Sequence, residues 1–335
     1  MDVIDYLQKQ GYKTINSEYY AAIDGWDSWY RGNVKDFHHY KVYNGKKFVK
    51  KYRKTLAMPK KVSEDFANLL LNEKVKITLD DDKSQEFVDN VLDRNNFMVK
   101  GNEAQELKAA LGTVVYLPYV TGSTEANGII SGGNIDINYV PGNRVYPLSW
   151  RNGKVIDCAF GADITHQDKT YIHLQIHTLK PEGYLIENKM FETTNGKFML
   201  VNLNAVPGYE NVARSIQTSF TERQFVIDRP NIANNYDKLS PMGVSLFANS
   251  IDVMRGLDLA YDSYCNEFET GRKRVFVRPE MLSMDDDGVV GFDTNETTFY
   301  MLPDDDSGDK KTFLQEVNME LRTTAHNEAI AESLQ

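Results

Sequence analysis

Three runs of aspartate are the residues of this sequence that could hold a metal ion. They occupy positions 80–82, 285–287 and 304–306. A calcium loop needs alternating aspartates, a glycine and a glutamate six positions beyond that glycine, and none of the three runs fits this pattern. Aspartate also favours turns, because its carboxylate binds nearby backbone N–H groups. We therefore expect three acidic turns, with a divalent ion held by Asp304, Asp306 and Asp309 as the alternative.

Histidine and cysteine could ligate a metal or act as nucleophiles, but their spacing does not bring such groups together. His173 and His177 share one face of an expected strand with no carboxylate nearby to support a metal, and the adjacent histidine pair 38–39 points in opposite directions. Cys158 and Cys265 each stand alone in apolar sequence. We predict two buried, reduced thiols and no metal site.

The signatures of common enzyme classes are absent from the sequence. It contains no phosphate-binding loop of the GxxxxGKS/T kind, no GxGxxG after a strand, no GxSxG elbow and no HExxH. An ATP-driven motor could hardly lack a phosphate-binding loop. We therefore expect a protein that is not an enzyme, with no catalytic residues and no cofactor.

Two basic clusters could contact an acidic partner. From Lys41 to Lys61 the chain has nine Lys or Arg and no acidic residue. This run is either a solvated face or a contact with DNA or a neighbouring subunit, for which the candidates are Lys46, Lys47, Lys50, Lys51, Arg53 and Lys54. The second cluster either complements the negative end of a helix dipole or binds an acidic partner, and it consists of Arg272, Lys273, Arg274 and Arg278.

Composition limits the class of protein. The chain has 335 residues, of which 41% are hydrophobic and 26% charged, which is typical of two or three globular domains. Its formal net charge of −10 argues against a protein whose main task is to grip nucleic acid, although it allows a surface past which DNA slides. No apolar stretch is long enough to span a membrane and no signal pattern is present, so we expect a soluble intracellular protein without membrane contact.

Periodicity predicts the elements that position these residues in the first two thirds of the chain. Helices are expected near 3–11, 60–73, 84–97 and 102–112, and strands at 75–79 and 113–120. Alternation around Asn44-Gly45 predicts a β-hairpin. Short strands with regular turns between 134 and 201 predict an antiparallel meander. Residues 205–240 are expected to form a linker or a crossing loop.

Two long helices are predicted in the last third. The first is expected to begin with Ser240 as its N-cap and Pro241 at the first helical position, and to end at Gly271. A β-rich insert is expected from 274 to 303, and a second helix from about 310 to 335. The chain stops inside that second helix, which predicts that the natural protein continues. The apolar stripes of the two helices include Phe247, Ile251, Met254, Tyr261, Tyr264, Phe268, Leu314, Val317 and Leu321.

Long segments of the sequence resemble a known family. The strings "WDSWYRG", "FHHYKVYNGKKFVKKYRKTLAMPKKVSEDFANLLLNEKVKI" and "RPNIANNYDKLSPMGVSLFANSIDVMRGLDLAYDSYCNEFETGRKRVFV" resemble portal (head-to-tail connector) proteins of tailed bacteriophages and prophages of Gram-positive bacteria. The resemblance covers nearly the whole chain. It implies an α+β portal fold with a wing at 1–240, a first stem helix at 241–273, a clip at 274–307 and a second stem helix at 308–335. It also implies that the apolar stripes of the two stem helices pack within and between subunits. Portals of this type normally continue into a tunnel loop, a further long helix and a crown, so the resemblance implies that the natural protein extends beyond Gln335.

The resemblance also implies a function and a set of partners. Portal subunits form a ring of about twelve copies at a capsid vertex, through which double-stranded DNA is packaged by a separate terminase and later ejected. The implied partners are other copies of the chain, the terminase large subunit, the major capsid or scaffold protein and a head-completion adaptor. The implied location is the virion, after assembly in the host cytoplasm. The clip residues expected to bind partners are Arg272, Lys273, Arg274, Phe276, Arg278 and Phe292.

Two other functions stay open at this stage. A metal-dependent phage nuclease or hydrolase would use the aspartate-rich turns, and it requires acidic side chains to converge from separate elements. A small DNA-binding module in residues 35–61 would show salt-sensitive affinity for DNA.

Overall fold

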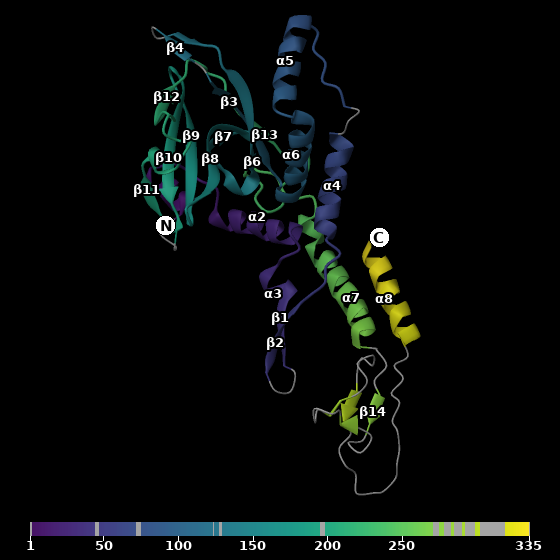
Figure 1. The fold of residues 1–335 in the computed structure, drawn as a ribbon. Coiled ribbons are helices and arrows are strands. Elements are labelled where there is room, and N and C mark those ends of the chain that lie inside the picture. Colours follow the sequence, from purple (N-terminus) through teal and green to yellow (C-terminus); the bar gives the residue numbers. More distant parts are fainter. Residues whose placement is uncertain are drawn as a thin grey trace, which may run out of the picture. The chain divides into compact units, whose positions relative to one another are not determined.

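The computed structural model describes residues 2–43, 47–71, 75–122, 124–126, 129–194, 198–270, 275–277, 283–284, 290–291, 299–301 and 319–334. The chain divides into two compact units (Figure 1). Unit 1 comprises residues 1–35 and 57–251, and unit 2 comprises residues 36–56 and 252–335. Helices and strands occur in both units, which confirms the predicted α+β class.

The larger sheet of unit 1 is an antiparallel meander. Its strands lie in the order β11-β10-β9-β8-β7, and β12 also pairs with β10. Neighbours in the chain are neighbours in the sheet because tight turns join them, and the β7–β8 turn has positive φ angles at both Asn152 and Gly153. The prediction of a meander is confirmed for β7 (Val145–Arg151), β8 (Lys154–His166), β9 (Lys169–Lys180), β10 (Gly183–Glu192) and β11 (Met199–Val201).

A second, three-stranded sheet has the order β13-β3-β6. The predicted strand at 113–120 is β3 (Val114–Thr121), and β6 (Asn134–Pro141) pairs with it along its whole length. The prediction that the meander begins at residue 134 is therefore wrong, because β6 belongs to this second sheet. The expectation of a linker or crossing loop at 205–240 is wrong in part, because this segment supplies β12 (Ser215–Gln217) and β13 (Val226–Asp228). A short ladder joins β4 (Thr124–Ala126) and β5 (Ile129–Ser131).

Periodicity predicted α1 (Val3–Lys9), α4 (Met58–Leu70), α5 (Asp82–Arg94) and α6 (Phe97–Leu111) in unit 1. It did not predict α2 (Ser17–Tyr30). Gly112 closes α6 in a left-handed conformation, as expected for a C-terminal glycine. The predicted strand at 75–79 is wrong. The side chain of Gln85 binds both the N–H of Leu79 and the carbonyl oxygen of Ile77, so a side chain takes the place of a neighbouring strand.

The predicted start of the long helix is also wrong. Helix α7 begins at Ile251, ten residues after Pro241, and is preceded by a 3-10 turn at Ala248–Ser250. The backbone of this segment binds the end of α6 instead of continuing as a helix: the N–H of Gly243 donates to Thr113 Oγ1, and that of Leu246 donates to the carbonyl oxygen of Ala109. Phe247 therefore lies in the core of unit 1 rather than on the helix.

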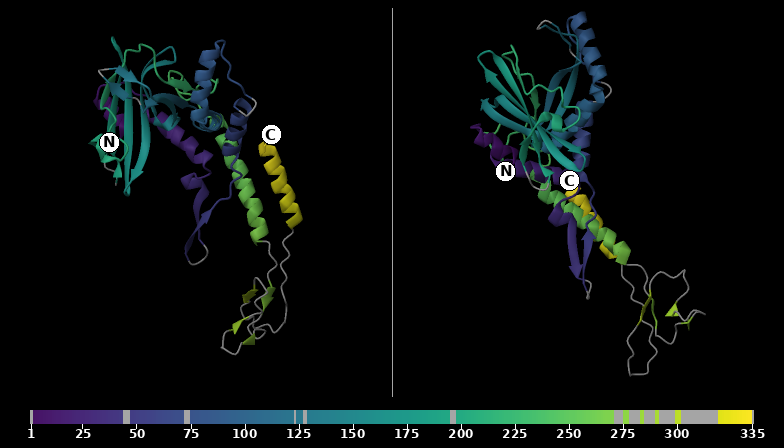
Figure 2. Two further views of the ribbon diagram at one scale, coloured as in Figure 1. Left: turned by 45° about the horizontal axis from the view of Figure 1, so that its top comes forward. Right: turned by 60° about the vertical axis from the view of Figure 1, so that its left-hand side comes forward.

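Unit 2 contains a hairpin, two long helices and short strands (Figures 1 and 2). The hairpin consists of β1 (His39–Tyr43) and β2 (Phe48–Tyr52), after the short helix α3 (Lys35–His38). Helix α7 (Ile251–Thr270) and helix α8 (Met319–Leu334) are neighbours, with the rings of Tyr264 and His326 6.4 Å apart. Between them in sequence, β14 (Val275–Val277) pairs with β17 (Phe299–Met301), and β15 (Ser283–Met284) pairs with β16 (Val290–Gly291).

Candidate interaction site

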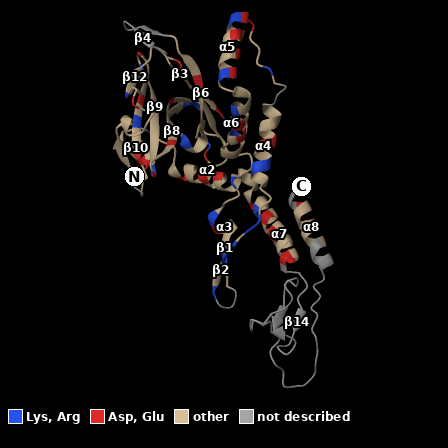
Figure 3. Ribbon diagram, viewed as in Figure 1, with Lys and Arg blue, Asp and Glu red and all other residues tan. Residues whose placement is uncertain are grey.

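The six candidate contact residues of the basic run, at positions 46–54, divide into two groups in the structure. Lys50 and Lys51 are exposed on strand β2, and Lys47 is exposed at its start. Arg53 and Lys54 follow the strand and contact α7. Lys46 lies outside the described residues. Figure 3 shows the basic residues along the hairpin and the acidic residues along α7. Only part of the run is therefore available to a partner.

Asp258 is the buried acceptor that joins the hairpin to α7. Its Oδ1 accepts a hydrogen bond from the N–H of Leu56 at 2.9 Å, and its Oδ2 lies 3.2 Å from Nε2 of His38. The Asp258 side chain is 4% exposed and that of His38 is fully buried. A buried carboxylate is tolerated only where its oxygens are bonded, and both oxygens are bonded here.

The opposite directions predicted for the histidine pair 38–39 are confirmed, because His38 is buried and His39 is exposed.

Asp262 forms a second buried link one helical turn later. Its Oδ1 accepts a hydrogen bond from the N–H of Lys54 at 3.0 Å, and its Oδ2 lies 3.9 Å from Nε of Arg53. Arg53 is also fixed from the hairpin side, because its Nη1 donates to the carbonyl oxygen of Phe37 and its guanidinium lies 4.2 Å from the centre of the Phe37 ring. Tyr40 on strand β1 has a raised pKa. Its burial is the main cause, and the nearby Asp262 carboxylate is the second.

Sequence reasoning did not select these two aspartates. Asp258 and Asp262 are four residues apart, so they lie on one face of α7. Their acceptors bind groups that lie about two hundred positions earlier in the chain. A pair of acidic residues beside the apolar stripe of a helix could have indicated them, because a buried carboxylate requires hydrogen-bond donors from another element.

The predicted helix-packing residues are only partly brought together. Ile251, Met254, Tyr261 and Tyr264 are half-buried on α7, and Phe268 is exposed although its ring packs against that of Tyr264. Leu314 and Val317 lie outside the described residues, as does the side chain of Leu321. The proposed clip residues Arg272, Lys273, Arg274, Arg278 and Phe292 also lie outside them, and Phe276 lies in β14 with its side chain undescribed.

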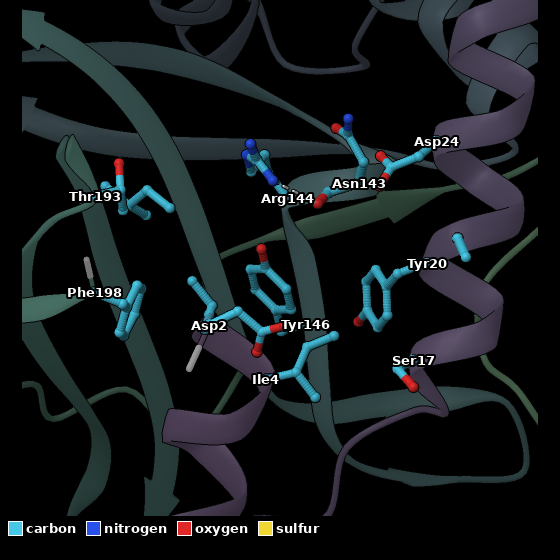
Figure 4. Close-up of a pocket in the computed structure, with 13 residues that line it drawn as sticks. Asp2, Ile4, Ser17, Tyr20, Asp24, Asn143, Arg144, Tyr146, Thr193 and Phe198 are labelled. Atoms are coloured by element: carbon cyan, nitrogen blue, oxygen red, sulfur yellow. Dashed lines mark hydrogen bonds between the residues drawn. The ribbon is translucent and has the colours of Figure 1, made fainter. Parts of the chain in front are cut away.

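A cavity of about 440 Å³ in unit 1 is the other place where polar side chains converge (Figure 4). The rings of Tyr20 and Tyr146 lie 5.4 Å apart in it, and the hydroxyl of Tyr20 donates to the carbonyl oxygen of Val145. Burial raises the pKa of both tyrosines, so neither supplies a base near neutral pH. Arg144 binds Asp163 at 2.8 Å.

Other reactive groups are separated. Cys158 and Cys265 are both free thiols, and burial raises the pKa of Cys158. Among the described residues, no group of three or more His, Cys, Asp or Glu side chains could hold a metal ion. The aspartate runs at 285–287 and 304–306 lie outside the described residues. In the described part of the chain, no helix is long and apolar enough to cross a membrane.

Comparison with known proteins identifies a family. A family model described as "Phage portal protein, SPP1 Gp6-like" matches residues 10–334. A search of curated proteins finds no match. The matched range includes both units, with the hairpin, α7 and α8.

Proposed function

Because the chain belongs to the SPP1 Gp6-like family of phage portal proteins, we propose that it is one subunit of a ring-shaped channel at a capsid vertex. The family match over residues 10–334 is the observation that carries this proposal, and it supports a portal function in phage DNA packaging. In the proposed ring, of about twelve copies, double-stranded DNA passes through the centre during packaging and ejection. The subunit acts as a structural component, and a separate terminase supplies the ATP hydrolysis.

The proposed division into portal regions keeps the predicted order with revised helix bounds. Residues 1–240 form the wing, residues 274–307 the clip, and helices α7 and α8 the two stem helices. The order helix, short strands, helix in unit 2 supports this assignment, as does the contact between Tyr264 and His326 on the two helices. The first stem helix then starts at Ile251 instead of Pro241.

The apolar side chains of α7 support packing between subunits. Val253 and Leu259 are 54% and 49% exposed in the single chain, and Phe268 is 44% exposed. Exposed apolar side chains on one helix indicate a surface that a partner covers. In the proposed ring, stem helices of neighbouring copies cover these residues.

The clip is proposed as the docking surface for other proteins of the particle. Its basic and aromatic residues would contact the terminase large subunit during packaging and a head-completion adaptor afterwards, through Arg272, Lys273, Arg274, Phe276, Arg278 and Phe292. The wing would contact the capsid or scaffold protein. These partners are proposed from the family to which the chain belongs.

Electron microscopy of the purified chain tests the proposed function. We expect closed rings with a central channel, and native mass spectrometry should give one defined number of copies. A chain that stays monomeric at every concentration, or that forms only open chains of subunits, would contradict the proposal. The nuclease alternative predicts metal-dependent cleavage of DNA that is lost in Asp304→Ala, and we expect no cleavage in either form.

A further inference from the structure

One face of the β1–β2 hairpin carries two lysines that repel each other. The strand register places Lys41 directly opposite Lys50, and the pairs His39–Tyr52 and Tyr43–Phe48 lie on the same face on either side. We call this surface the lysine face. Like charges directly opposite each other destabilise a pair of strands. Among the described residues neither Lys41 nor Lys50 has a carboxylate partner.

The lysine face is the more exposed side of the hairpin. Alternation along the strand puts Tyr40 on the other side, where Arg53 lies 5.0 Å from its ring and where burial, followed by the Asp262 carboxylate, raises its pKa. On the lysine face, by contrast, Tyr43, Phe48 and Tyr52 are 56%, 69% and 50% exposed. The hairpin thus presents two positive charges framed by exposed aromatic rings.

An isolated two-stranded hairpin is marginally stable in water. Here the links to Asp258 and Asp262 hold its base, but they do nothing to offset the repulsion between Lys41 and Lys50. An anionic partner would offset that repulsion, and exposed aromatic rings around it would gain from being covered. The lysine face therefore has the chemistry of a contact with an acidic, partly apolar surface.

Helix α8 carries a surface of complementary chemistry. Glu328 and Glu332 are both exposed, and among the described residues neither has a cationic partner. They are four residues apart, so they lie on one face of the helix about 6 Å apart along its axis. The lysines are separated by a similar distance, because side chains directly opposite on two strands have Cβ atoms about 5 Å apart.

The same surface of α8 points away from α7. His326 contacts Tyr264 of α7, and Glu328 is about 200° further round the helix at about 100° per residue. Ala325 and Ala331 are also exposed, and their small side chains leave room for aromatic rings to lie against the helix. We call the surface formed by Glu328, Glu332 and these two alanines the glutamate face.

We propose that the lysine face of one copy of this chain docks on the glutamate face of a neighbouring copy. The inference rests on the proposed ring and names two surfaces that join its subunits. Because the two surfaces differ, the contact is head-to-tail and repeats from copy to copy, as a closed ring requires. A second copy is favoured over DNA because the exposed alanines beside Glu328 and Glu332 offer the aromatic rings of the lysine face an apolar surface, which a phosphate backbone does not.

Charge reversal tests the proposal with two double variants. Lys41→Glu with Lys50→Glu makes both faces negative, and Glu328→Lys with Glu332→Lys makes both faces positive. We expect each double variant to need at least about ten-fold more protein for half-maximal assembly, since like charges across an interface cost several kcal/mol. Sedimentation velocity measures assembly, and circular dichroism checks that each variant is folded.

Mixing the two double variants gives the decisive result. In an equal mixture, the lysine face of the first variant is negative and can bind the glutamate face of the second variant, which is positive. The unchanged lysine face of the second variant can likewise bind the unchanged glutamate face of the first. We expect the mixture, and the chain with all four substitutions, to assemble at about the wild-type concentration. Lys83→Glu with Lys180→Glu is the matched control, because it changes the net charge equally at two exposed lysines of unit 1.

The outcomes separate this inference from the proposed function. Wild-type chain that forms no rings contradicts the portal assignment itself. If the wild-type chain forms rings and both double variants also assemble normally, only the docking of the two faces is contradicted. A mixture of the double variants that fails to assemble contradicts it as well. If Lys41→Glu with Lys50→Glu forms normal rings but loses binding to double-stranded DNA, the lysine face is a DNA contact and the proposal is wrong.

Discussion

His177 is buried in unit 1, and neither of its ring nitrogens has a hydrogen-bond partner among the described residues. Its ring lies between Phe160 and Phe225, with ring centres 5.3 and 5.8 Å away. Burial lowers the pKa of His177 to about 4, because the charged imidazolium would lose its hydration. Burial also lowers the pKa of His173, although the hydrogen bond that its Nε2 donates to Asn188 Oδ1 acts to raise that pKa. The larger sheet therefore contains groups that resist protonation while the chain is folded.

The first prediction concerns acid stability. The unfolded chain binds a proton at His177 below about pH 6.5, but the folded chain does so only near pH 4, so stability falls as the pH drops between these values. Between pH 7.5 and 4.5 this group should account for a loss of about 2 to 3 kcal/mol in the free energy of unfolding. His177→Phe should remove that share of the loss, as measured by urea unfolding at both pH values.

His166→Gln provides the comparison for this experiment. His166 is a partly exposed histidine at the end of β8 in the same sheet, and its replacement should keep the pH dependence of the wild-type chain. Equal losses of stability in His177→Phe and in the wild type would show that His177 does not resist protonation.

The second prediction concerns the buried link between the hairpin and α7. Asp258→Ala leaves His38 and the N–H of Leu56 buried without their acceptor. We expect a loss of at least about 2 kcal/mol in the free energy of unfolding, since an unsatisfied buried donor costs about 1–3 kcal/mol. Hydrogen exchange at the Leu56 amide should become faster. Asp252→Ala, at an exposed position in the first turn of α7, should change neither quantity by a comparable amount.

Periodicity predicted most helices and strands, and two of the predictions that failed share a physical cause. The helix from Ser240 and the strand at 75–79 were both inferred from local patterns. In each case the backbone groups form hydrogen bonds with another part of the chain. Thr113 and Ala109 accept hydrogen bonds from the segment before α7, and the Gln85 side chain binds the backbone of residues 77 and 79. Local propensity is a weak prior that such contacts override.

The candidate site was predictable in one half only. Alternation around residues 44–45 gave the hairpin and its exposed lysines, because a basic surface strand is visible in the sequence itself. The acceptors that hold its base were not predictable, because Asp258 and His38 are 220 positions apart and no local pattern relates them. The sequence did not predict the glutamate face of α8, because exposed glutamates on a helix are common. Their proposed role follows only from the lysine face of the neighbouring copy.

The third prediction concerns two glycines, one in the segment before α7 and one inside the helix. A Cβ atom at Gly243 would lie 2.1 Å from the carbonyl oxygen of Gly112, whereas a Cβ atom at Gly256 would meet nothing within 4 Å. Gly243→Ala should therefore lower the free energy of unfolding by at least about 1–3 kcal/mol, the usual cost of overpacking. Gly256→Ala, inside α7, should raise it by about 0.5–1 kcal/mol, because glycine weakens a helix interior.

Thermal and urea unfolding of the two variants side by side checks these signs. The same Gly-to-Ala change is made in both, so a difference in sign depends on the surroundings alone. If Gly243→Ala proved as stable as the wild type, the contact between the end of α6 and residues 241–246 would be looser than the structure indicates.

At the scale of the whole molecule, net charge opposes assembly. Each copy carries a formal charge of −10, so copies in a ring repel one another over distances comparable with the screening length. That length falls from about 30 Å at 0.01 M salt to about 8 Å at 0.15 M. The fourth prediction is that rings form at lower protein concentration in 0.15 M salt than in 0.01 M salt.

Sedimentation velocity across this salt range measures the effect. An uncharged osmolyte at equal osmolality should not reproduce it, because it does not screen charge. Assembly that is strongest at 0.01 M salt would mean that attraction between unlike charges outweighs the net repulsion between copies.

The distance along the chain between the hairpin and α7 also sets an order of events during protein synthesis. The N–H of Leu56 finds its acceptor Asp258 only after about 200 further residues have been translated, which takes roughly 10 to 40 s at bacterial rates. Throughout that interval the hairpin is a two-stranded edge with exposed aromatic rings, the kind of surface on which nascent chains aggregate. The paired lysines that destabilise the hairpin then also protect it, because their charge keeps other unfinished chains away.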